Sequence, residues 1–271
     1  MRVLAAILAL LIANTGFGGS ERSTPVSTNR PPAEVGFRVG EVLLYRLKWG
    51  IIPVGTARIV SDWTEDTPPA VRIRLYVRSN SFLDRLYRID DHIETIAEPS
   101  QLLPFRFEKQ MNEGGALRRD ITTFDREIGR VSWSNLLKPE TRAYDAPHDI
   151  RDIISMMFAL RSTPFKAGDE TEYVITGDDG PAPVKIRVLE HRTFKTDRYG
   201  SIPAIHIRPT VNDDGLFLGR TPRDLWISES LPHVLLLLSV DAPIGTIRLI
   251  LDAVEGVEEW PPPSQQDTQP L

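Results

Sequence analysis

Residues 71–78 read VRIRLYVR, a strict alternation of apolar and polar side chains. Because successive side chains of a β-strand point to opposite faces, this segment places four apolar side chains on one face and three arginines on the other. Residues 43–49 repeat the period, with apolar or aromatic side chains at every second position and Arg46 and Lys48 between them. Both segments predict β-strands that bury one face.

The same period of two recurs along most of the chain. Glu113-Gly114-Gly115 and Asp178-Asp179-Gly180 are turn-forming clusters, which predict hairpins between neighbouring strands. With the first two segments included, about a dozen strands are predicted. The further segments are residues 89–95, 105–107, 119–124, 131–134, 172–176, 184–191, 202–209, 224–228, 234–240 and 246–254.

One segment has the period of a helix instead. Its apolar residues recur at spacings of three and four, namely Ile150, Ile153, Ile154, Met157, Phe158 and Leu160. Asp149 stands ahead of them as a candidate N-cap, Arg161 lies in the last turn, where a cation suits the helix dipole, and Pro164 ends the run. We therefore predict one helix of about a dozen residues.

The order of these elements decides the fold class. Many strands with short turns and no intervening helices cannot form a parallel, doubly wound sheet. We predict a mainly β protein: a large curved antiparallel sheet or a partly open β-barrel, with one central α-helix packed on, or plugging, its concave side.

Composition and charge exclude several classes of function. With 41% hydrophobic and 25% charged residues, the chain has the composition of a folded globular protein. A net charge of −5 argues against nucleic acid as a partner, because phosphate binding requires a basic face. The sequence contains no cysteine, which excludes disulfides, zinc–thiolate sites and cysteine nucleophiles.

The N-terminal segment has the layout of a secretory signal peptide. Arg2 precedes an uncharged apolar run at residues 3–13, and Gly16-Phe17-Gly18 places small residues at the positions that precede cleavage. This run is too short to cross a bilayer, and no later apolar run is long enough to do so. No cysteine follows it, which excludes a lipid anchor. We predict export to the periplasm as a soluble protein.

The rest of the chain divides by composition. Residues 1–18 are the predicted signal peptide, and residues 19–36 are rich in Ser, Thr and Pro, as in a flexible linker. Residues 37–260 form a single predicted β-rich domain, and the polar, proline-rich residues 261–271 form a predicted disordered tail.

Three stretches resemble a known family of exported bacterial proteins, the domain-of-unknown-function 3108 family. They are residues 37–55 (FRVGEVLLYRLKWGIIPVG), 152–161 (DIISMMFALR) and 225–235 (LWISESLPHVL). In the third stretch the match is looser, because Ser230 and His233 stand where the family pattern has Asp and Val. The resemblance implies export and a β-rich fold; it implies no established activity and carries no catalytic residues.

Signatures of familiar active sites are missing. The sequence has no phosphate-binding glycine loop, no nucleophile elbow and no His-Glu-x-x-His motif, and we expect no cofactor. Asp90 and His92 share a face of their strand, but two ligands do not make a metal site, and we expect none. His206, between Ile205 and Ile207, is interpreted as a solvent-facing or hydrogen-bonded strand histidine rather than a general base. Residues 212–215 (NDDG) indicate a turn, because the distal Glu of a calcium loop is absent.

Seven residues are candidates for ligand binding. They are Tyr45, Trp49, Phe105, Phe107, Asp152, Arg161 and Trp226. The aromatic side chains are either core residues or part of a ligand cage, and the two charged side chains are either favoured by the helix dipole or face a ligand. The arginines at 72, 74 and 78 either pair with acids on neighbouring strands or meet anionic lipid headgroups.

These observations favour a non-catalytic binding or carrier protein over an enzyme. A curved sheet of this size can enclose an apolar ligand, and in a bacterial envelope that ligand would be a lipid or a lipoprotein acyl chain. Two alternatives remain: an envelope hydrolase without a familiar motif, and a protein-interaction module that uses an exposed strand edge.

Overall fold

A computed structural model describes residues 36–177, 180–211, 224–242, 245–257 and 260–261. The predicted signal peptide, nearly all of the predicted linker and tail, and the turn at residues 212–215 lie outside the described residues. So do residues 178–179 of one predicted hairpin turn. None of the described helices is long and apolar enough to cross a membrane.

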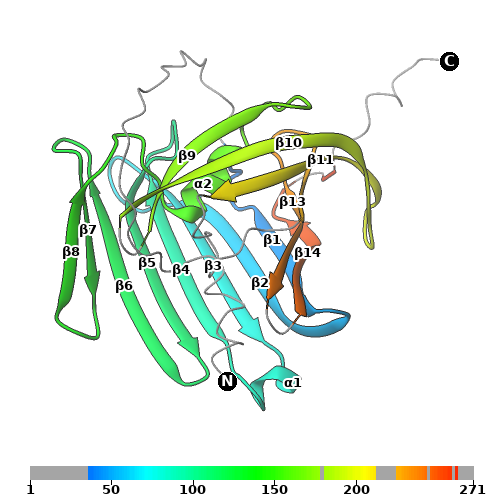
Figure 1. Cartoon of the computed structure of the whole chain (residues 1–271), viewed down its shortest axis with the longest axis horizontal. Helices are drawn as coiled ribbons and strands as arrows, with labels where there is room; N and C mark the ends of the chain where they lie inside the picture. The colour runs from blue at the N-terminus through cyan, green and yellow to red at the C-terminus, as the bar shows by residue number, and fades with distance from the viewer. Residues whose placement is uncertain (1–35, 178–179, 212–223, 243–244, 258–259, 262–271) are drawn as a thin grey trace.

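The described strands form one antiparallel sheet of fourteen strands (Figure 1). They are β1 (Val42–Trp49), β2 (Ile52–Trp63), β3 (Val71–Ser79), β4 (Asp90–Ala97), β5 (Pro104–Glu113), β6 (Ala116–Asp125), β7 (Arg130–Asn135), β8 (Glu140–Asp145), β9 (Glu170–Thr176), β10 (Pro181–Thr196), β11 (Gly200–Val211), β12 (Asp224–Ser228), β13 (Leu235–Ala242) and β14 (Gly245–Glu255). Strands that follow each other in the sequence are paired, except β8 and β9, which form the two edges of the described sheet. Strand β1 pairs with β14 as well as with β2.

The sheet curves around a hydrophobic core without closing into a barrel. In Figure 1, β4 to β8 lie on one side and β10 to β14 on the other, and β1 joins the two halves through its pairing with β14. The predicted fold class, a mainly β protein with a large curved sheet, is confirmed. It follows from the alternation in the strands: in β3, for example, the apolar residues at 71, 73, 75 and 77 are buried.

Helix α2 (Ile153–Leu160) crosses the concave side in the connection from β8 to β9. Just before the helix, Arg151 makes a parallel bridge with Ile175 of β9. On the other side of the helix start, Thr95 of β4 donates a hydrogen bond to Asp152. The beginning of α2 is therefore tied to both halves of the sheet.

Two strands and one short helix were not predicted. Strand β2 carries Pro53 and Gly55, which obscure its period, and β8 is exposed along nearly its whole length, so it shows no apolar alternation. Gly55 is required where it stands, because a Cβ atom there would lie 2.3 Å from the carbonyl oxygen of Arg78 on β3. Helix α1 (Ser81–Asp84) is a single turn capped by Asn80.

The arginine stripe of β3 pairs with acids on the neighbouring strands. Arg74 forms an ion pair with Asp62 of β2. Towards β4, the Arg78–Asp90 ion pair has an N–O distance of 3.1 Å. Arg72 likewise lies 3.9 Å from Glu94 of β4. The structural interpretation of the stripe is thus confirmed, and these arginines do not form an uncompensated basic surface.

The cap of α2 corrects one detail of the sequence analysis. The N-cap is Asp152, not Asp149: its Oδ1 accepts hydrogen bonds from the backbone N–H groups of Ile154 and Ser155. The Ser155 hydroxyl lies 3.1 Å from the backbone nitrogen of Asp152, which completes a capping box. Asp149 is exposed and lies outside the helix, because the chain first has to bridge to β9 before it can turn into α2.

Alanine substitutions at Asp152 and Asp149 test which of the two aspartates caps α2. We expect Asp152→Ala to lower the free energy of unfolding by about 1–2 kcal/mol, because it removes the cap. The matched control Asp149→Ala should change it by less than about 0.5 kcal/mol. Urea unfolding followed by circular dichroism measures both, and equal effects would contradict this assignment of the cap.

Candidate ligand-binding site

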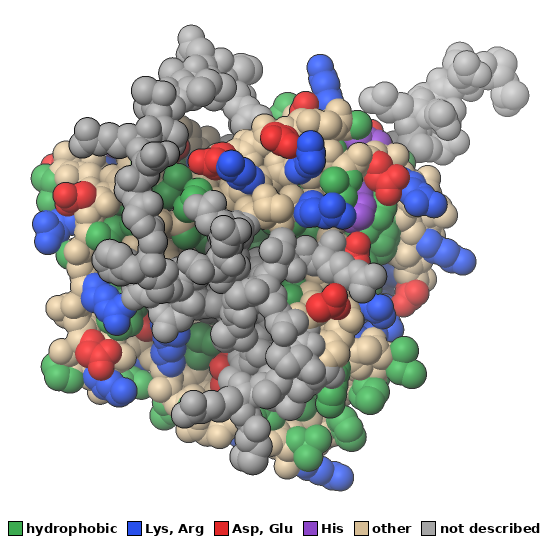
Figure 2. All heavy atoms as spheres, viewed as in Figure 1, with side chains coloured by type: hydrophobic (Ala, Val, Ile, Leu, Met, Phe, Trp, Pro, Cys, Tyr) green, Lys and Arg blue, Asp and Glu red, His purple; other side chains and the backbone are tan. Residues whose placement is uncertain are grey.

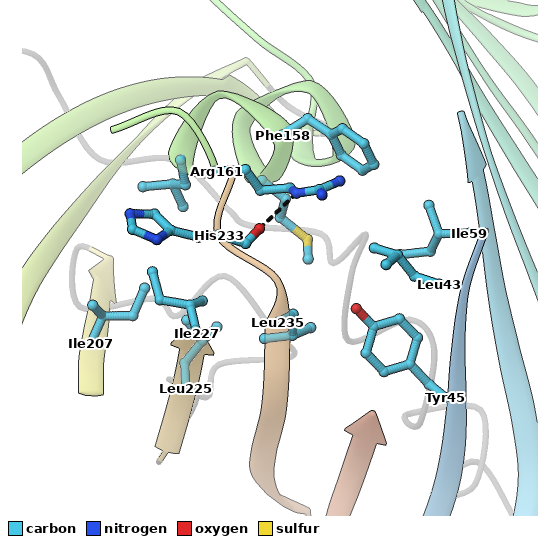
Figure 3. A pocket seen from close by; sticks show the side chains of 12 residues that line it. Leu43, Tyr45, Ile59, Phe158, Arg161, Ile207, Leu225, Ile227, His233 and Leu235 are labelled. Atoms are coloured by element: carbon cyan, nitrogen blue, oxygen red, sulfur yellow. Dashed lines mark hydrogen bonds between the residues drawn. The ribbon is translucent and has the colours of Figure 1, made fainter. Parts of the chain in front are cut away.

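An apolar cavity lies between the concave face of the sheet and the C-terminal half of α2 (Figure 3). Its volume is about 40 Å³. The walls come from β1 and β2 on one side and from β11, β12 and β13 on the other. The lining residues are Leu43, Tyr45, Ile59, Met157, Phe158, Leu160, Arg161, Ile207, Leu225, Ile227, His233 and Leu235.

Tyr45 brings a polar group into this apolar space. Figure 3 shows its hydroxyl directed towards the space between Leu43, Leu235 and Arg161. The residue is only 1% exposed, and its hydroxyl has no hydrogen-bond partner among the described residues. Burial raises the pKa of the Tyr45 phenol far above its ordinary value; the positive charge of Arg161 opposes this effect. The group therefore stays protonated and can donate a hydrogen bond.

The local backbone sets the direction of Tyr45. The register of β1 against β14 shifts between Leu44 and Tyr45, but the extra residue there is Asp252 of β14, and β1 keeps its alternation. Leu43 and Tyr45, two residues apart, both face the cavity.

A buried ion pair closes one end of the cavity. Arg161, the C-cap of α2, forms a two-pronged contact with Glu41, which precedes β1. Nη1 lies 2.6 Å from Oε2, and Nη2 donates to Oε1 at 2.9 Å. Both residues are buried, so each charge depends on the other for compensation.

His233 joins the same end of the helix to the turn between β12 and β13. Its backbone carbonyl accepts a hydrogen bond from Arg161 Nε at 2.7 Å, drawn dashed in Figure 3. Its ring nitrogens lie 2.7 Å and 2.8 Å from the carbonyl oxygens of Ser228 and Thr163. Burial lowers the pKa of His233, and these two carbonyls oppose the shift. Both ring nitrogens thus face protein carbonyls; a neutral ring donates to one of them and a protonated ring to both.

The cavity brings together two of the seven predicted residues, Tyr45 and Arg161. Asp152 is fully buried at the other end of α2, where its carboxylate caps the helix. Burial raises the pKa of Asp152, and its hydrogen bonds oppose that rise.

The other four predicted residues lie apart from the cavity. Phe107 is buried in the core, and Phe105 is 47% exposed. Trp49 lies at the far end of β1, beside Gly245. Trp226 is on the opposite face of β12, stacked on His206 with ring centroids 4.3 Å apart.

The two strand histidines considered in the sequence analysis, His92 and His206, both stack on aromatic rings. His92 stacks on Tyr76, with ring centroids 4.7 Å apart. His206 lies 3.4 Å from Asp224 and 3.7 Å from Glu190, besides its stacking on Trp226. No group of three metal-ligating side chains occurs among the residues that the structure describes. Figure 2 shows acidic and basic side chains interspersed over the visible face, without a single-sign patch.

Sequence reasoning missed two residues of the site, Glu41 and His233. Glu41 lies in the first family-like stretch, and Arg161 ends the second. Their opposite charges were the signal in the sequence that could have suggested an ion pair. His233 was noted as a departure from the family pattern. Neither signal shows that the two residues meet at the end of α2, because the residues in contact lie 120 and 72 positions apart.

A second buried polar group lies on the concave side of β4 to β6, outside the cavity. Lys109 and Asp120 form an ion pair across β5 and β6, with an N–O distance of 3.5 Å. Nearby on β4, Asp91 accepts a hydrogen bond from the backbone of Asn112, and its other carboxylate oxygen has no partner among the described residues. Burial raises the pKa of Asp91 to about 6.

Comparison with known proteins identifies a family and a fold. The model of a family described as "Protein of unknown function (DUF3108)" matches residues 44–252. A search of curated proteins returns no match. Among solved structures, the chain is similar to a beta-barrel-like protein of domain of unknown function DUF1849 from Brucella abortus. The TM-score is 0.54 at 11% identity, covering 82% of this chain and 99% of that one, and the likeness concerns the fold alone.

Tyr45→Phe tests whether the hydroxyl lacks a partner in the protein. Because the variant removes a buried, unpaired polar atom, we expect the free energy of unfolding to rise by about 1 kcal/mol. The matched control is Tyr76→Phe on the outer face of β3, which should change it by less than about 0.5 kcal/mol. Chemical denaturation measures both; a clear loss of stability in Tyr45→Phe would show that the hydroxyl is already bonded.

Asp91→Asn tests the role of the buried Asp91 carboxyl through the pH dependence of the free energy of unfolding. In the folded protein the carboxyl holds its proton up to a pH of about 6; in the unfolded chain it loses it near 4. The free energy of unfolding should therefore fall as the pH rises between these values. In Asp91→Asn that fall should disappear, which raises stability at pH 7 by about 3 kcal/mol.

The control for this change of charge is Asp90→Asn on the opposite face of β4. Asp90 pairs with exposed arginines, and such surface pairs contribute little. Denaturant unfolding at intervals of about one pH unit between pH 3 and pH 8 gives the comparison. A pH profile of Asp91→Asn identical to that of the wild type would contradict the assignment.

Proposed function

The chain belongs to the DUF3108 family, whose function is unknown, and from its cavity we propose that it is a non-catalytic protein that binds an apolar ligand. The ligand would insert an apolar group between the concave face of the sheet and α2. We further propose that the protein works in the periplasm after export, as its N-terminal sequence predicts.

The observation that carries the proposal is the unpartnered Tyr45 hydroxyl in a mostly apolar cavity. Buried polar groups almost always have a hydrogen-bond partner, and those without one call for an explanation. Here the hydroxyl is buried, points into the cavity and has no partner among the described residues. A few convergent polar groups in an apolar pocket are typical of small-molecule sites. A bound ligand would supply the missing partner.

The size of the cavity limits what enters it without rearrangement. About 40 Å³ exceeds the roughly 10–15 Å³ that one water molecule needs, but falls short of the roughly 300–1,000 Å³ of pockets for whole ligands. The site therefore suits the end of an acyl chain, or a longer segment after side chains move. Met157 and Leu225 are half-buried, whereas the other lining residues are buried, so these two residues would form the rim. The unbranched side chain of Met157 adapts readily to a new neighbour.

The cavity's polar groups argue against a hydrolase at this site. Glu41, beside the cavity, is neutralised by Arg161, and both ring nitrogens of His233 face backbone carbonyls. A general base needs a free acceptor within reach of its substrate, and a nucleophile needs such a base. Among the described lining residues, none combines these roles.

Native mass spectrometry of the protein, purified without detergent from a bacterial periplasm, tests the proposal. We expect the intact mass of residues 19–271, together with additional mass that denaturation releases as an apolar ligand. An apo mass in every preparation would contradict ligand binding. An uncleaved N-terminus would contradict the proposed export separately.

A cavity-filling variant makes this test specific. In Ile59→Phe the added ring occupies the cavity, and we expect the copurified ligand to fall at least about fivefold, which corresponds to ~1 kcal/mol of lost binding. The control Ile250→Phe carries the same substitution at a half-buried position of β14 outside the cavity and should retain the ligand. Equal ligand content in both variants would place the ligand elsewhere.

A further inference from the structure

We infer that the polar group of the ligand that reaches this cavity is an uncharged hydrogen-bond acceptor, such as the carbonyl oxygen of an acyl ester, and not a free carboxylate. The inference rests on the proposed function and deepens it. It follows from how the charges around the cavity compensate each other and from the unpartnered hydroxyl of Tyr45.

The charges at the cavity compensate each other. Arg161 is the cation among the lining residues, and both of its terminal nitrogens face the carboxylate of Glu41. This fork-to-fork geometry is the arrangement in which a guanidinium binds a carboxylate most strongly. A second carboxylate, from a fatty acid, would have to displace Glu41 and leave it buried without a partner.

Arg161 and His233 make further contacts with the protein. Arg161 Nε donates to the carbonyl of His233, and the ring nitrogens of His233 lie 2.7 Å and 2.8 Å from the carbonyl oxygens of Ser228 and Thr163. These bonds hold the end of α2 to the sheet, so a ligand could recruit the donors only by detaching the helix. These contacts therefore stabilise the fold.

Among the described lining residues, the Tyr45 hydroxyl is the uncharged polar group that has no hydrogen-bond partner. Its phenol is protonated at neutral pH, and its oxygen has no protein partner among the described residues. One neutral donor satisfies one acceptor oxygen. It does not repay the transfer of an ionised carboxylate into an apolar space, for which desolvation is far more costly. The site therefore discriminates against the anion.

The test uses two probes that differ in charge: methyl octanoate and octanoate at pH 7.5. Isothermal titration calorimetry with the periplasm-purified protein, after removal of any bound lipid, measures both affinities. We expect methyl octanoate to bind at least about tenfold more tightly than octanoate. In Tyr45→Phe the affinity for the ester should fall about fivefold, the value of one neutral hydrogen bond. Tyr76→Phe, with its tyrosine on the outer face, should bind as the wild type does.

A charge variant provides an independent measurement. Glu41→Gln leaves the charge of Arg161 uncompensated next to the cavity, so octanoate should gain affinity relative to the ester. Thermal unfolding of this variant establishes whether it folds. If it does not, the comparison of Tyr45→Phe with Tyr76→Phe decides the question alone, because neither substitution disturbs an ion pair.

The outcomes distinguish this inference from the function on which it rests. If octanoate binds as tightly as the ester, or if Tyr45→Phe binds the ester unchanged, the inference is wrong while the binding function stands. If neither probe binds and Ile59→Phe copurifies with as much ligand as the wild type, the proposed function fails as well. Preference for the ester that depends on Tyr45 supports both.

Discussion

The ion pair between Glu41 and Arg161 is the contact on which the arrangement of this protein depends. The sheet does not close, so its concave side would be open to solvent without α2. Glu41 precedes β1, the strand that joins the two halves of the sheet, and Arg161 ends α2. Both partners are buried, and breaking such a pair typically costs about 3–5 kcal/mol because one charge is left uncompensated. The pair thereby fixes the helix over the centre of the sheet.

The two ends of α2 are held by different means, and this determines where space remains. At its start, Asp152 receives hydrogen bonds from the helix backbone and from Thr95, and the first residues of the helix are buried. At its end, Arg161 contacts Glu41 ahead of β1, and the His233 ring contacts Thr163, just after the helix. The cavity lies between these contacts, with Tyr45 at its wall. In the same region the charges of Glu41 and Arg161 compensate each other, and the uncharged Tyr45 hydroxyl has no partner among the described residues.

The sequence predicted the architecture well because alternation records which side chains of a strand are buried. It predicted α2 from its helical period and placed Arg161 at its end. It missed β2, where Gly55 allows a close approach to β3, and β8, whose residues are largely exposed. The N-cap was assigned three residues too early, because the bridge between Arg151 and β9 is a contact between distant segments that no local pattern reveals.

The candidate site was less predictable for a related reason. The alternation of apolar and polar residues shows on which face of its strand a residue lies, but not which part of that face packs against a helix. Tyr45 and Trp49 share a face of β1, yet only Tyr45 reaches the cavity. Trp226 belongs to the opposite face of β12, as its alternation with Leu225 and Ile227 already implied. Glu41 and His233 reach the candidate site only through contacts made across the fold.

The measurement that tests this account most directly is a crystal structure of the periplasm-purified protein bound to methyl octanoate. The account predicts the ester's carbonyl oxygen within hydrogen-bond distance of the Tyr45 hydroxyl, its chain between the two walls of the cavity, and the Glu41–Arg161 pair intact. A structure with the Tyr45 hydroxyl bonded to another group of the protein, and the ester absent from the cavity, would contradict it.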